Sequence, residues 1–235
     1  MRGLRNFQPG RLYGITQRGN KGQWVCRDEE DFARSFELMR KYTARYGVKV
    51  HGWCVLHNHG HWIFEASDAE SISNAMRDMQ GQFSRFLNQK YRGSPWLLFG
   101  SLGGSRRRKR GWTRYLRAGP TNWSPRFDAQ LLDDLGFKSF LRYVELNPVR
   151  AKLVGSAERW AWSSARAHVT GVDPTGLLCF EQFNRWSLDW GAFLRAPLEA
   201  EKTAVAWERV RSGSVWNRPA WDLLVAKEVA GRAVG

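Results

Sequence analysis

Two histidines in the first third of the chain have a spacing that could hold a metal ion. His59 and His61 are separated by one residue within the β-rich segment 58–65. Because successive side chains of a strand point to opposite faces, both imidazoles would leave the same face and could reach one ion. An isolated pair of this kind is more often exposed or hydrogen-bonded than metal-binding, so a third ligand is needed.

A tyrosine and an amide lie together near the end of a helical pattern later in the chain. Tyr143 and Asn147 are four residues apart and therefore share one side of a helix, beside the apolar stripe that would dock on a sheet. They could thus meet the two histidines. The alternative is a half-buried aromatic residue and a polar residue before Pro148, which is common at helix ends, and spacing alone favours it.

The elements that would position these side chains follow from hydrophobic periodicity and turn residues. We expect strands at 11–17, 48–56, 58–65 and 126–132, and helices at 28–47, 67–91 and 135–147, the last ended by Pro148. This order predicts an α+β sandwich, an antiparallel sheet covered by helices in the ferredoxin-like manner, with a C-terminal helical appendage. We divide the chain into a catalytic domain, 1–155, with a basic insertion at 93–122, and an extension, 156–235.

The charge balance points to a polyanionic partner. Lys and Arg number 37 against 22 Asp and Glu, a formal charge of +15 that suits a phosphate-backbone binder. The insertion carries a run of five cations, which is either a strand-binding segment or only a solvated loop. The cations that we expect on nucleic acid are Arg18, Lys21, Arg77, Arg85, Arg106, Arg107, Arg108, Lys109, Arg110 and Arg126.

Cysteine usage and hydropathy narrow the class of protein. The three cysteines are odd in number and far apart, so neither a disulfide framework nor a paired-cysteine zinc site is indicated. No apolar run has membrane-spanning length, and no apolar stretch follows the first cations. We therefore expect a cytoplasmic protein without a membrane partner.

Two segments resemble a known family when they are taken together. The segment 57–63 (HNHGHWI) resembles the histidine strand of the single-tyrosine, or HUH, transposases, and 142–150 (RYVELNPVR) resembles their tyrosine helix. The nearest branch is the REP-associated tyrosine transposases, which show segments similar to 15–20 (ITQRGN) and 160–164 (WAWSS). The resemblance runs from about residue 13 to about residue 168.

The resemblance implies a role for each residue of the pattern. Tyr143 would be the nucleophile, and His59, His61 and Asn147 would bind Mg²⁺ or Mn²⁺. Attack on a phosphodiester would give a 5′-phosphotyrosine and a free 3′-hydroxyl, and the covalent bond would conserve the energy needed for rejoining. The partner would be single-stranded DNA that carries hairpin repeats. The protein itself would be a nucleoid-associated bacterial protein that acts as a monomer, and a dimer is the alternative.

The chain departs from the family pattern in ways that leave alternatives. Gly60 stands where a bulky hydrophobe is usual, and His57 stands where proline is common. A glycine packs nothing and loosens a strand, unless Trp62 and Phe64 compensate. One alternative is a catalytically decayed or repurposed protein that binds single-stranded DNA or RNA hairpins. Another is a metal-dependent nuclease that uses water and forms no covalent adduct.

Overall fold

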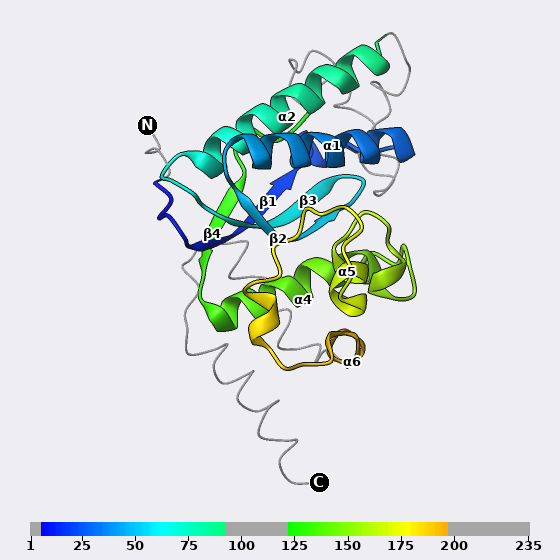
Figure 1. The fold of residues 1–235 in the computed structure, drawn as a ribbon. Helices are drawn as coiled ribbons and strands as arrows, with labels where there is room; N and C mark the ends of the chain where they lie inside the picture. The colour runs from blue at the N-terminus through cyan, green and yellow to red at the C-terminus, as the bar shows by residue number, and fades with distance from the viewer. Residues whose placement is uncertain (1–5, 93–121, 197–235) are drawn as a thin grey trace.

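The core of the fold is a four-stranded antiparallel sheet between two layers of helices (Figure 1). The computed structural model describes residues 6–92 and 122–196. The spatial strand order β2-β3-β1-β4 results from two strand–helix–strand units, and it confirms the predicted α+β class. The strands are β1 (Leu12–Arg18), β2 (Lys49–Val55), β3 (His59–Glu65) and β4 (Asp128–Leu132).

One face of the sheet is covered by two long amphipathic helices, α1 (Glu29–Arg45) and α2 (Ser71–Lys90). Asp28 caps α1 by accepting the N–H of Asp31 at 3.0 Å, and Gly47, at φ +63°, follows its end. The apolar stripes of both helices pack on Ile15, Trp62 and Phe64, which point to this face. This layer is the larger part of the core.

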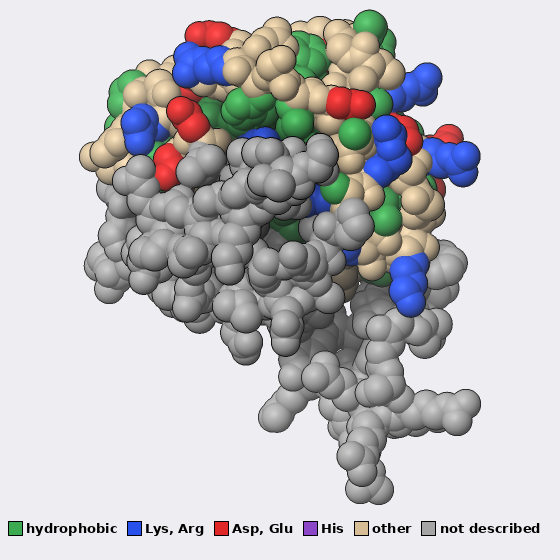
Figure 2. Space-filling view, turned by 90° about the horizontal axis from the view of Figure 1, so that it is seen from below, with side chains coloured by type: hydrophobic (Ala, Val, Ile, Leu, Met, Phe, Trp, Pro, Cys, Tyr) green, Lys and Arg blue, Asp and Glu red, His purple; other side chains and the backbone are tan. Residues whose placement is uncertain are grey.

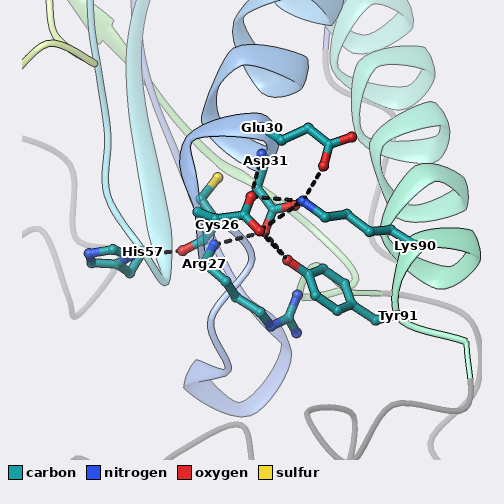
Figure 3. A network of polar contacts seen from close by, with 8 residues as sticks. Cys26, Arg27, Glu30, Asp31, His57, Lys90 and Tyr91 are labelled. Carbon is teal, nitrogen blue, oxygen red and sulfur yellow. Dashed lines mark hydrogen bonds and ion pairs between the residues drawn. The ribbon is translucent and has the colours of Figure 1, made fainter.

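Polar contacts join the start of α1 to the end of α2 and fix the loop between β1 and α1 (Figure 3). Lys90 contacts the carboxylates of Asp28, Glu30 and Asp31 at 2.7 to 3.0 Å. In the same loop the carbonyl of Cys26 accepts a hydrogen bond from Nδ1 of His57 at 2.8 Å. The loop thereby holds the connection that leads directly into β3.

The opposite face of the sheet is covered by α4 (Asp134–Arg150). Two glycines let this helix lie close to the strands, because a Cβ on Gly14 would lie 2.7 Å from Phe140 and one on Gly52 would lie 2.5 Å from Leu141. The predicted end at Pro148 is wrong, since the helix continues to Arg150. Proline lacks only its own N–H, and the next turn is still closed by a bond of 2.9 Å from Ala151 N–H to the Asn147 carbonyl.

The described part of the extension lies against α4 and the edge strand β2. It includes η3 (Ala157–Arg159), α5 (Ala165–Thr170), η4 (Phe183–Arg185) and α6 (Trp190–Arg195). Backbone bonds of 2.9 and 3.0 Å connect Val55 to Trp162 and Ser164 to Trp53. The division at residue 155 stays a prediction, and the extension as far as 196 packs directly on the helix that carries Tyr143.

A buried carboxylate fastens this extension to α4. Glu145 accepts hydrogen bonds from Ser164 Oγ at 2.6 Å, from His168 Nδ1 at 2.5 Å and from Trp190 Nε1 at 2.7 Å. Glu145 and Ser164 are fully buried, so these bonds form away from solvent.

In the segments 6–92 and 122–196, no helix has the length and apolar character needed to cross a membrane.

Candidate active site

The two histidines of the pair lie on β3 and face α4. Their ring centroids are 5.0 Å apart, and the rings are perpendicular. Nδ1 of His59 is 2.6 Å from Oδ1 of Asn58, and Nδ1 of His61 is 2.9 Å from Oγ1 of Thr16 on the neighbouring strand. Because each ring uses Nδ1 in a hydrogen bond, each presents Nε2 as its metal-binding nitrogen.

Tyr143 reaches this pair from α4. Its hydroxyl lies 3.5 Å from Nε2 of His61, and the two rings meet edge to face with centroids 5.2 Å apart. The ring is half-buried, and it also packs against Phe140, which stands over Gly14 of β1. The close approach of α4 to the sheet therefore brings the phenol to the histidines.

Asn147 lies one turn after Tyr143 and completes the group. Its Nδ2 donates to the Tyr143 carbonyl at 3.1 Å, which leaves Oδ1 as the amide atom suited to a cation. Hydrogen bonding with Asn147 acts to raise the pKa of His59 and to lower the pKa of Tyr143. The structure thus brings together all four residues that the sequence singled out for chemistry.

Burial and nearby cations set the protonation of these groups. Burial, together with the charge of Arg18, lowers the pKa of His59 to about 4. Burial and the neighbouring His59 also hold the pKa of His61 well below its usual value. Both imidazoles are therefore neutral near pH 7, which is the form that binds metals. Burial raises the pKa of Tyr143, while Arg150, Asn147 and Arg18 lower it.

The side chains around Tyr143 include three donors that could hold a metal ion. Within the described segments no three His, Cys, Asp or Glu side chains form a metal-binding group. A site here would use two imidazoles and the Asn147 amide, a set with no negative charge that leaves positions for phosphate oxygens and water. The neutral histidines and their Nδ1 hydrogen bonds fit such a site.

The glycine between the histidines does not leave a gap. A Cβ on Gly60 would lie only 2.4 Å from Cη2 of Trp62, because the indole of Trp62 lies across Gly60 on the face opposite the histidines. The space that a bulky side chain would fill is therefore occupied by a ring from two residues further along. This is the compensation by Trp62 that the sequence left open.

The predicted DNA-contacting cations fall into separate places. Arg18 is the last residue of β1, pairs in register with His59 and therefore lies near the site. Arg126 is exposed, and it follows a segment whose backbone is hydrogen-bonded to the Arg18 carbonyl. Arg77 and Arg85 are exposed on α2, across the sheet from Tyr143. The side chain of Lys21 and the run Arg106, Arg107, Arg108, Lys109 and Arg110 lie outside the described residues.

The described cations do not gather in one patch on the face seen in Figure 2. Lys and Arg side chains there are spread among Asp and Glu side chains. Among the tryptophans of the described segments only Trp24 is exposed, at 48%, and it stacks on His57 with centroids 4.6 Å apart. The other described indoles are buried or half-buried, as expected for core residues.

Sequence reasoning missed three residues that touch the site. Thr16 and Asn58 bond to the histidines, and Arg150 places its guanidinium carbon 4.0 Å from the centroid of the Tyr143 ring. Alternation along β1 could have indicated Thr16, which pairs with His61. Arg150 stands in the segment that resembles the tyrosine helix, seven residues and hence about two turns after Tyr143.

Comparisons with known proteins find one matching family model and similar solved structures. Residues 22–97 match the family model of IS200-like transposases, a range that contains both histidines but ends before Tyr143. A solved REP-associated tyrosine transposase, bound to a REP hairpin, has a similar fold, with a TM-score of 0.53 and 16% sequence identity. The match covers 85% of this chain and 96% of that one. No match is found among curated proteins.

A second solved structure, described as a transposase of Deinococcus radiodurans, has a TM-score of 0.37 at 14% identity, over 65% of this chain and 92% of that one. The family match confirms the resemblance to IS200-like transposases over residues 22–97. The likeness to the hairpin-bound REP-associated tyrosine transposase confirms it for the fold. The fold class is confirmed by the same structure. The roles of individual side chains stay predictions.

Proposed function

We propose that this protein is a metal-dependent transposase or nickase that cuts and rejoins single-stranded DNA through a covalent bond to Tyr143. The observation that carries the proposal is the approach of the Tyr143 hydroxyl to His61, at 3.5 Å, beside His59 and Asn147. A nucleophile, two neutral imidazoles and an amide oxygen meet on one side of the sheet. The family match supports a DNA-directed reaction.

The chain's own residues account for most of the reaction. The Tyr143 oxygen attacks phosphorus, the bond from phosphorus to the 3′ oxygen breaks, and the phenolic proton ends on that 3′ oxygen. Rejoining is the reverse, with the 3′-hydroxyl as nucleophile. Burial raises the pKa of Tyr143, and the charges of Arg150 and Arg18 oppose that rise and so favour the ionised phenol. His59, His61 and Asn147 would hold Mg²⁺ or Mn²⁺, which would polarise a phosphate oxygen.

The partner proposed for this site is single-stranded DNA that carries hairpin repeats. The similar solved protein is bound to a REP hairpin, and the charge of +15 on this chain suits any nucleic acid. Phosphate contacts position a strand but do not identify its sequence. We propose a monomer, in a bacterial cytoplasm and near the nucleoid, as the acting species.

The test is a covalent adduct on a labelled oligonucleotide. Wild-type protein with Mn²⁺ should give a protein–DNA species that survives denaturing electrophoresis, and Tyr143→Phe should give none while binding DNA almost equally. Tyr46→Phe is the control, because Tyr46 is the C-cap of α1 in the other helix layer and bonds to Asp78. Cleavage without an adduct would favour the water-using nuclease, and binding without cleavage would favour a decayed protein.

A further inference from the structure

The guanidinium of Arg150 is held against the proposed nucleophile. Its central carbon lies 4.0 Å from the centroid of the Tyr143 ring, and its Nη2 donates to the Tyr143 main-chain carbonyl. The side chain therefore folds back along α4 by two turns. The guanidinium carbon lies over the Tyr143 ring, and the N–H donors of a guanidinium all lie in its plane, at its edges.

Arg150 brings a positive charge to the residues of the proposed site. Its field acts on His59, His61 and Tyr143, as does the field of Arg18 at the end of β1. Burial lowers the pKa of Arg150 to about 10, so this partly buried group stays charged near pH 7. Desolvation of a cation is costly and is offset when an anion binds beside it.

A phosphodiester is the anion that this reaction brings to Tyr143. We propose that Arg150 is a further catalytic residue, whose guanidinium contacts a non-bridging oxygen of the scissile phosphodiester while Tyr143 attacks. The inference rests on the proposed function and adds to it. Arg150 is not consumed: charge grows on the phosphate oxygens as the new phosphorus–oxygen bond forms, and the fixed cation stabilises it.

The alternative is that Arg150 only holds the Tyr143 ring and main chain in place. Both roles predict slower cleavage when Arg150 is replaced, so loss of activity does not separate them. They differ in their dependence on phosphate charge. A contact with the phosphate becomes dispensable when the oxygen that it stabilises is replaced by a neutral methyl group, whereas a packing role does not.

The experiment compares wild type, Arg150→Gln and Arg150→Lys on two oligonucleotides that differ only at the scissile phosphate. One carries the natural phosphodiester, and the other carries a methylphosphonate as separated diastereomers. The rate of adduct formation should fall by about 10² to 10³ for Arg150→Gln on the phosphodiester, the usual effect of removing one donor to a developing oxyanion. On one diastereomer the same variant should stay within about tenfold of wild type.

Arg166→Gln serves as the control, because Arg166 is exposed on α5. Arg150→Lys keeps the charge and should show a smaller loss than Arg150→Gln, and it carries the comparison if the Gln variant does not fold. An equal loss on all substrates, or no loss on the phosphodiester, would overturn the assignment while leaving the proposed function intact. No adduct from wild-type protein would overturn both.

Discussion

The indole of Trp62 lies across Gly60, so that a Cβ on the glycine would fall 2.4 Å from the ring. The two residues therefore act as a pair in which the second supplies the bulk that the first lacks. This relationship explains how a strand with glycine between two histidines keeps them in fixed positions. A side chain at position 60 would therefore require the indole or the strand to shift.

The first prediction concerns this pair. Gly60→Ala should lower the free energy of unfolding by about 1 to 3 kcal/mol, because overpacking a filled core forces the ring or the strand to move. Gly81→Ala is the matched control: Gly81 lies in α2 with open space at its Cβ, so alanine should stabilise by about 0.5 to 1 kcal/mol. Urea unfolding measures both. An unchanged stability of Gly60→Ala would show that the indole moves freely.

The second prediction concerns metal binding. His59→Ala or His61→Ala should abolish Mn²⁺ binding and adduct formation, since each removes one of three protein ligands. Thr16→Val should weaken Mn²⁺ binding by about 10- to 100-fold, because His61 loses the hydrogen bond that orients its ring. Thr170→Val, at an exposed position, is the control. Calorimetric titration gives the affinities, and wild-type affinity in both histidine variants would refute the metal assignment.

The third prediction is a pH dependence of stability without metal. The pKa of His59 is about 4 in the folded protein, below the usual value of 6.5. Between these two pH values the unfolded chain is protonated at His59 and the folded protein is not. The free energy of unfolding contributed by His59 should therefore fall as the pH drops from about 6.5 to about 4, with no further loss below that. The difference between wild type and His59→Gln isolates the effect, and a flat difference would contradict the assigned burial.

The fourth prediction separates the two groups of cations. Arg18 and Arg126 lie at the end of the sheet near the site, whereas Arg77 and Arg85 lie on α2 across the sheet. Replacing Arg18 and Arg126 by Ser should flatten the slope of log affinity against log salt by about 1.4, since each phosphate contact contributes about 0.7. Replacing Arg77 and Arg85 should change it less. A larger change in slope for the Arg77 and Arg85 replacements would place the DNA strand on α2.

The fifth prediction concerns the buried carboxylate behind Tyr143. Glu145→Gln turns an amide nitrogen toward donors from Ser164, His168 or Trp190, so the free energy of unfolding should fall by about 3 kcal/mol. The control Glu37→Gln removes only an exposed ion pair on α1 and should change it by less than about 1 kcal/mol. Equal effects would mean that the extension contributes little to the α4 layer.

Sequence patterns predicted the helices and strands, because these depend on local periodicity, and they placed each pair of candidate residues on one face. The roles of the four residues were predicted from the family resemblance, because spacing alone favoured the alternatives. Alternation placed His59 and His61 on one face, and a spacing of four placed Tyr143 with Asn147. The end of α4 was misplaced because proline blocks only one backbone bond there. Thr16 and Arg150 were not predicted from the sequence. The contact of Thr16 depends on strand register, and that of Arg150 depends on a side chain that folds back along the helix.

Peptide mass spectrometry can show directly whether the Tyr143 oxygen becomes covalently bonded to DNA. The adduct formed with Mn²⁺ would be digested with nuclease and protease, and the peptide that carries the nucleotide would be sequenced. We expect a nucleotide linked to Tyr143 through its 5′-phosphate, with the 3′-labelled fragment retained on the protein. A nucleotide on another residue, or retention of the 5′-labelled fragment instead, would contradict it.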